Sequence, residues 1–202
     1  MKKISILTLL LFFAFTLNSG QNPQELKVFI GVDMEGISSV VTSREYSSSG
    51  EDYEYFRRIM TLETNAAIEG AIAAGAAEIV VRDGHGSARN ILPGLLDRNA
   101  KLLRGWADSP KSMMEGIDET FDAVVFVGYH AKAGTPDAII AHTMSGNVVD
   151  VSINGVSLPE AGINGLIAGH FNVPVVFLSG DKAICGQAKG LFGEVETYAV
   201  KE

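Results

Sequence analysis

Short apolar segments that alternate with helical segments are the feature that most restricts the fold of this chain. The four clearest apolar segments are residues 27–32, 78–82, 122–127 and 173–178. Each is a nearly continuous run of apolar, often β-branched residues, which is typical of strands covered on both faces. Two segments between them, residues 51–74 and 160–170, have the composition and spacing of helices. This alternation predicts an α/β fold with a largely parallel sheet flanked by helices.

Three weaker patterns add to this prediction. Residues 101–104 are read as a further strand and residues 112–117 as a short helix. Residues 148–153 are read as a strand that ends at Asn154-Gly155, a pair that favours tight turns. With 202 residues, of which 47% are hydrophobic, the chain is long enough for one domain with a real core, which we expect over residues 21–202.

Acidic and histidine side chains follow the predicted apolar segments. They are Asp33 and Glu35, Asp83 and His85, His130, and His142 after the apolar run 138–141. Because ligands of open α/β sheets bind beyond the carboxyl ends of the strands, we expect these side chains to converge at that edge. Side chains alternate along a strand, so Asp33 and Glu35 point to the same side, where a cation between them would offset their repulsion. Solvated strand-end acids are the simpler explanation of that pair taken alone.

Carboxylates and imidazoles together suit Zn²⁺ or a similar divalent ion. Glu160 is predicted to be the third acid, because it follows Pro159 at the start of a predicted helix, where the helix dipole favours a carboxylate. These groups are sufficient for two ions that share one carboxylate. Asp83 is read as an acceptor that orients His85 rather than as a metal ligand, and a turn-forming role is the alternative. His170, at a predicted helix end, is interpreted as a cap or surface residue.

Charge and cysteine content exclude several classes of function. The net charge is −8 and no basic stripe occurs, which argues against nucleic acid and anionic membrane surfaces as partners. Cys185 is the only cysteine, so neither an intrachain disulfide nor a cysteine-rich zinc site can form. The sequence also has no phosphate-binding loop of the Walker type, no GxGxxG after a strand and no GxSxG motif.

Residues 1–20 have the pattern of a secretory signal peptide. Lys2 and Lys3 precede an apolar run over residues 4–17, and small or polar residues follow at 18–20. The run is short for a membrane-spanning helix, which needs about 20 residues. We therefore expect an exported protein, periplasmic or secreted, without a membrane contact after cleavage. An uncleaved N-terminal anchor is the alternative.

Eight short motifs in a fixed order make the chain similar to a known family. They are residues 32–37, 58–61, 83–85, 112–116, 128–131, 135–136, 142–144 and 160–164. In this combination the chain resembles the zinc-dependent D-aminopeptidases of the dipeptide-transport type, peptidase family M55. The resemblance covers nearly all of residues 21–202. Family members usually continue beyond the position of Glu202, so we expect this chain to lack the family's C-terminal segment.

The resemblance implies an activity and a set of site residues. It implies two zinc ions per subunit, with Asp33 as the shared ligand and Glu35, His85, His130 and Glu160 as the others. His142 is implied as the catalytic histidine, acting as nucleophile, proton shuttle or oxyanion stabiliser. The implied substrates are short peptides with an N-terminal D-amino acid, such as D-Ala-D-Ala, and the implied assembly is a ring-like homo-oligomer.

Two other functions stay open at this point. A different dinuclear hydrolase, such as an amidase or a phosphoesterase, would use the same metal ligands. A truncated protein that binds metal or a small ligand without turnover would also retain them. We expect a dinuclear zinc aminopeptidase in preference to either.

Overall fold

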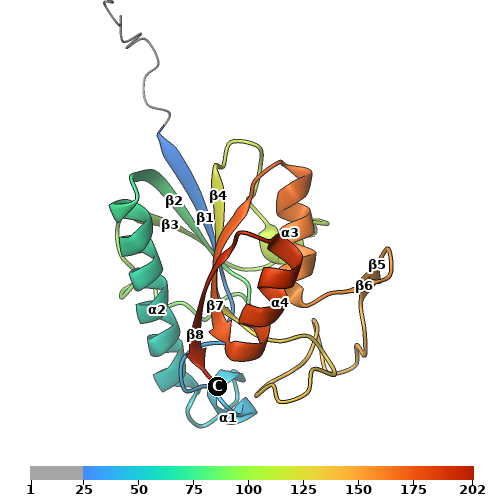
Figure 1. Ribbon diagram of the computed structural model, residues 1–202. Coiled ribbons are helices and arrows are strands. Elements are labelled where there is room, and N and C mark those ends of the chain that lie inside the picture. The colour runs from blue at the N-terminus through green and yellow to red at the C-terminus, as the bar shows by residue number, and fades with distance from the viewer. Residues whose placement is uncertain (1–24) are drawn as a thin grey trace, which may run out of the picture.

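The computed structural model describes residues 25–202, which form a six-stranded parallel sheet flanked by helices (Figure 1). The strand order is β3-β2-β1-β4-β7-β8, and all neighbouring strands in this sheet are parallel. The strands are β1 (Leu26–Val32), β2 (Ala76–Asp83), β3 (Ala100–Leu103), β4 (Ala123–Tyr129), β7 (Val175–Asp181) and β8 (Glu196–Lys201). The predicted α/β fold with a largely parallel sheet is therefore confirmed.

Helices cover both faces of the sheet and explain its continuous apolar strands. Helix α2 (Tyr53–Ala73) packs on one face, and α3 (Glu160–His170) and α4 (Lys182–Phe192) pack on the other. Along β1, Ile30 and Val32 belong to the core beneath α2, whereas Phe29 belongs to the core beneath α3 and α4. Because successive strand residues point to opposite faces, a strand buried on both sides must be apolar at nearly every position.

The remaining elements are short and connect the strands to the helices. They are α1 (Ser43–Tyr46), a 3₁₀ turn (Ser112–Met114), β5 (Ser152–Ile153) and β6 (Val156–Ser157). The predicted helix over 112–117 is thus only a 3₁₀ turn. The predicted strand over 148–153 is wrong for residues 148–151, because this segment lies beside no strand of the main sheet. The turn at Asn154-Gly155 is confirmed, since β5 and β6 pair antiparallel around it.

The longer elements α4 and β8 were not predicted, and neither were the short elements α1 and β6. Helix α4 buries only Ile184, Cys185 and Ala188, and glycines interrupt its apolar pattern. Strand β8 lies at the sheet edge and is largely exposed, so it lacks the apolar run of a central strand. Within residues 25–202 no helix has both the length and the apolar character needed to cross a membrane. The predicted signal peptide, residues 1–20, lies outside the described residues.

Candidate metal centre

The carboxyl ends of β1, β2 and β4 bring the predicted site residues together. Asp33 and Glu35 follow β1, His85 follows β2, and His130 follows β4. Glu160 is the first residue of α3, and His142 lies on the loop that leads from β4 toward β5. The ligand atoms of these six side chains form three groups, and within each group every ligand atom lies within 4.8 Å of the others. The groups are Asp33, Glu35 and His85; Asp33, His130 and Glu160; and Glu35, His130 and His142.

Two glycines allow the loop after β1 to touch the end of β4. The backbone N–H of Gly36 donates to the carbonyl of Gly128 over 2.7 Å. A Cβ atom on Gly36 would lie 1.8 Å from the Tyr129 carbonyl oxygen. Gly128 has φ +73, and a Cβ there would lie 2.3 Å from the Asp33 carbonyl oxygen. Any side chain at either position would force the two backbone segments apart, so these glycines place Asp33 beside His130.

The first group of ligand atoms surrounds the Nδ1 atom of His85. This nitrogen lies 2.9 Å from Glu35 Oε2 and 3.2 Å from Asp33 Oδ1. The other ring nitrogen, Nε2, lies 2.9 Å from the Tyr46 carbonyl oxygen. A carbonyl can only accept a hydrogen bond, so Nε2 carries a proton and Nδ1 is the nitrogen directed toward the acids. This is the arrangement of a metal-binding histidine held by a backbone carbonyl.

The second group repeats the arrangement around His130. Its Nε2 atom lies 3.3 Å from Glu160 Oε1 and 3.4 Å from Asp33 Oδ2. Its Nδ1 atom lies 3.1 Å from the Ala131 carbonyl oxygen, which assigns the proton to Nδ1 and leaves Nε2 to face the acids. Asp33 therefore directs one carboxylate oxygen toward each histidine and belongs to both ligand groups.

Burial makes this concentration of charge unfavourable without a partner of opposite sign. The Asp33, Glu35 and Glu160 side chains are all nearly inaccessible to solvent. Burial lowers the pKa of His85, but the hydrogen bonds and charges of Asp33 and Glu35 outweigh it and raise that pKa to about 11. Burial raises the pKa of Asp33, but interactions with His130 and His85 outweigh it and leave the pKa well below its usual value. The cluster thus favours bound positive charge, either protons or metal ions.

The residues present fit a divalent cation on two counts. Asp33 Oδ2 and His130 Nε2 are buried and have no hydrogen-bond partner of good geometry among the described residues, although orphaned buried polar atoms are rare. Ligands arranged tetrahedrally about 2.0–2.1 Å from a zinc ion lie about 3.3–3.4 Å from one another. The ligand atoms paired in the two groups are 2.9–3.4 Å apart.

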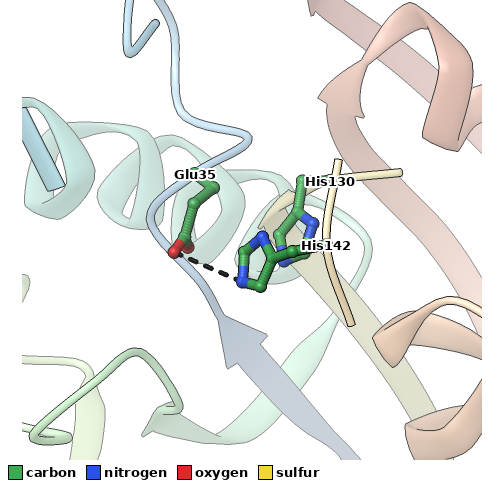
Figure 2. A group of neighbouring side chains, drawn as sticks. All are labelled: Glu35, His130 and His142. Carbon is green, nitrogen blue, oxygen red and sulfur yellow. Dashed lines mark ion pairs between the residues drawn. The ribbon is translucent and has the colours of Figure 1, made fainter. Parts of the chain in front are cut away.

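His142 lies closer to solvent than the other two histidines. Its ring stacks on that of His130, with centroids 4.0 Å apart, and its side chain is 23% exposed. Figure 2 shows its Nε2 atom directed toward Glu35, 3.7 Å from Oε1; Glu160 Oε1 is 3.6 Å away. Both distances are too long for hydrogen bonds. His142 also belongs to the third ligand group, with Glu35 and His130, so the structure places it within reach of a metal as well as of the cleft.

A cleft of about 180 Å³ opens onto the cluster. Its lining combines the acids and histidines Asp33, Glu35, His85, His142 and Glu160 with the apolar side chains of Trp106, Met113 and Met144. The cleft gives a small molecule access to the group of ligand atoms. Trp106 was not among the residues predicted from the sequence.

The Asp83 carboxylate contacts the loop that follows His85. Its carboxylate accepts hydrogen bonds from the Asn90 backbone N–H (2.6 Å), the Asn90 side-chain amide (2.7 Å) and the Ile91 N–H (2.8 Å). No hydrogen bond joins it to the His85 ring, which the Tyr46 carbonyl orients instead. Asp83 fixes the loop behind His85, because the same Asn90 amide also donates to the His85 carbonyl over 2.6 Å.

Asp181, the last residue of β7, is a positioning residue. Its Oδ1 atom accepts from the Ile184 N–H over 3.0 Å and caps α4, while Oδ2 accepts from the Ala131 N–H over 3.1 Å, next to His130. The capping signal would have been recognised if α4 had been predicted. His170 is exposed at the end of α3, outside the three ligand groups, as expected.

Comparison with known proteins places the chain in a family. The sequence model of the peptidase M55 family, described as D-aminopeptidase, matches residues 26–202. A D-aminopeptidase of Bacillus subtilis (strain 168) is 38% identical over 177 residues, which are 88% of this chain and 64% of that protein. The solved structure of the Zn-dependent D-aminopeptidase DppA from Bacillus subtilis, described as a self-compartmentalizing protease, superposes with a TM-score of 0.83 at 37% identity. That match covers 86% of this chain and 63% of the other, so this chain spans slightly less than two thirds of the length of both relatives. The family match over nearly all of the described residues, together with the shared fold, shows that the chain belongs to the peptidase M55 (D-aminopeptidase) family.

Proposed function

We propose that the protein is a zinc-dependent aminopeptidase that removes N-terminal D-amino acids from short peptides such as D-Ala-D-Ala. The observation that carries the proposal is the division of the Asp33 carboxylate between two histidine-containing ligand groups. The family relatives, named as D-aminopeptidases and in one case as Zn-dependent, support both the metal and the reaction.

Two zinc ions would be held by the two groups of ligand atoms. Asp33, Glu35 and His85 would bind one ion, and Asp33, His130 and Glu160 would bind the other. The donor set of oxygen and imidazole nitrogen without thiolate suits zinc. When bound, zinc polarises a carbonyl oxygen and lowers the pKa of a coordinated water, which is the chemistry that amide hydrolysis needs.

His142 would act on the substrate rather than hold a metal. It is the most exposed histidine of the cluster, and its Nε2 atom faces the cleft side of Glu35 and Glu160. The stacked His130 ring fixes the plane of the His142 ring, so the imidazole nitrogen is presented in one orientation. A positioned imidazole can accept a proton from a reacting group or donate one to it.

The size of the cleft supports short substrates. Its volume of about 180 Å³ is below the roughly 300–1,000 Å³ of pockets that enclose drug-sized ligands.

The assembly and the location of the protein belong to the same proposal. A homo-oligomer is supported by the relative described as self-compartmentalizing, and export is supported by the pattern of residues 1–20.

Zinc analysis combined with a dipeptide assay tests this function. We expect about two zinc ions per chain, hydrolysis of D-Ala-D-Ala in preference to L-Ala-L-Ala, loss of activity with a chelator and recovery with Zn²⁺. Full activity of metal-free protein would contradict the proposal. Hydrolysis of phosphate esters or other amides without any D-peptide would favour a different dinuclear hydrolase, and zinc binding without turnover would favour a non-catalytic protein.

A further inference from the structure

Trp106 stands at the cleft beside the metal-binding groups. It is the only tryptophan in the sequence, and its side chain is 49% exposed. It lines the same cleft as His142 and Glu160. A large, half-exposed aromatic side chain beside polar groups is the usual composition of a small-molecule site, where apolar walls surround a few polar anchors.

Two contacts hold the indole in a fixed orientation. Its Nε1–H donates to the Gly86 carbonyl over 2.8 Å, on the loop that carries His85. The guanidinium carbon of Arg82 lies 5.0 Å from the ring centroid, a cation–π contact. Arg82 is completely buried and is itself held by a hydrogen bond from Nη1 to the Gly105 carbonyl over 2.6 Å. The ring is therefore anchored to the protein, and its remaining surface faces the cleft and solvent.

The lining of the cleft includes both polar and apolar side chains. The carboxylates and imidazoles of the ligand groups lie together, and the apolar side chains of the lining are Trp106, Met113 and Met144. A peptide's amine and amide groups have affinity for the polar groups. Its side chains are left to pack on the apolar lining, of which Trp106 is the largest member.

We propose that Trp106 determines the side-chain preference of this site, as a rigid wall that favours small apolar side chains such as that of alanine. This inference rests on the proposed function, because it names the substrate class of that same site. A fixed aromatic wall in a cleft of about 180 Å³ leaves little room for a branched or aromatic substrate side chain. In a hydrophobic pocket a misfit of one methylene changes kcat/KM by about 10–200-fold.

The kinetic test replaces the wall and varies the substrate. The substrates are two dipeptide series, D-Xaa-D-Ala and D-Ala-D-Xaa, with Xaa as alanine, valine, leucine or phenylalanine. Wild type should prefer alanine in at least one series. Trp106→Ala should raise the kcat/KM of the larger side chains relative to alanine by at least about 10-fold in that series, with unchanged zinc content. Trp106→Phe, which keeps a flat ring but loses the hydrogen bond to Gly86, should lie between wild type and Trp106→Ala. Tyr55→Ala, which removes an exposed aromatic side chain outside the lining of the cleft, should match wild type.

A binding measurement makes the test independent of turnover. Because Trp106 is the only tryptophan, fluorescence excited at a wavelength that tyrosine does not absorb reports on this residue alone. Saturable fluorescence changes on titration with D-alanine, together with weaker binding of D-leucine, would support the role of Trp106 even if no D-peptide is hydrolysed. Such binding without hydrolysis would refute the proposed aminopeptidase function but not the role of Trp106. Active enzyme whose fluorescence ignores these ligands, or whose side-chain preference is the same in Trp106→Ala, would overturn the inference while the function stands. Absence of both hydrolysis and binding would overturn both.

Discussion

Replacement of Asp33 by asparagine should remove two zinc sites through one atom-for-atom change. The substitution keeps the size of the side chain and removes its negative charge. In the structure one carboxylate oxygen lies 3.2 Å from His85 Nδ1 and the other lies 3.4 Å from His130 Nε2. Both ligand groups therefore lose an anionic member. By contrast, His130→Ala removes a ligand from the group that contains Glu160 and leaves His85 with both of its acids.

The magnitude follows from linkage between zinc binding and folding. A ligand that binds only the folded state at 100 times its Kd stabilises that state by about 2.7 kcal/mol. For a chain of 202 residues, each 1 kcal/mol shifts Tm by about 2–4 °C. One zinc ion should therefore raise Tm by about 5–11 °C and two by about 11–22 °C. Asp33→Asn should abolish nearly all of this increase, whereas His130→Ala should abolish about half.

Calorimetry with and without a chelator, together with metal analysis by mass spectrometry, measures both quantities. The zinc-free proteins serve as the reference for each variant, so the intrinsic cost of the substitution cancels. The expected stoichiometries are about two, one and zero ions for wild type, His130→Ala and Asp33→Asn. An Asp33→Asn protein that retains one ion and half of the Tm increase would refute the bridging role of Asp33.

Three further predictions test other parts of the site. His142→Ala should keep both ions and lower kcat at least ~100-fold, because a positioned acid–base group contributes at least that much. The control His170→Ala should change neither the metal content nor kcat. Loss of an ion in His142→Ala would show that His142 is a ligand. Gly36→Ala should lower the free energy of unfolding by about 1–3 kcal/mol or more in chemical denaturation, because its Cβ would overlap a backbone carbonyl oxygen at 1.8 Å. In the control Gly94→Ala the Cβ meets nothing within 4 Å, so the free energy of unfolding should stay within about 0.5 kcal/mol of wild type. Equal effects of the two substitutions would contradict the close contact between Gly36 and the end of β4. Zinc affinity should rise with pH from 6 to 9, because zinc must displace a proton from His85, whose pKa is raised to about 11 without metal. Titration calorimetry in two buffers measures whether protons are released when zinc binds. A zinc affinity that does not depend on pH would contradict this prediction.

Several features were predictable because they depend on local pattern and on one rule of sheet geometry. Strands covered on both faces must be apolar at successive positions, as Phe29 and Ile30 show by entering opposite cores. The carboxyl ends of parallel strands meet at one edge, so residues that follow different strands, such as Asp33 and His130, were expected to converge. Helix α4 and strand β8 escaped prediction because glycines interrupt the one and exposure removes the apolar pattern of the other.

The sequence by itself therefore determined the fold class and the set of polar residues at the sheet edge. Only the tertiary structure decided which of those residues contact one another and which groups orient them. The two Asp33 carboxylate oxygens face different histidines because Gly36 and Gly128 let the loop after β1 touch the end of β4. The Tyr46 carbonyl, not Asp83, orients His85, and Trp106 reaches the cleft because its indole N–H is held by Gly86. These contacts join backbone atoms to side chains far apart in the chain, and the path of a loop leaves no periodic signal in the residues that form it.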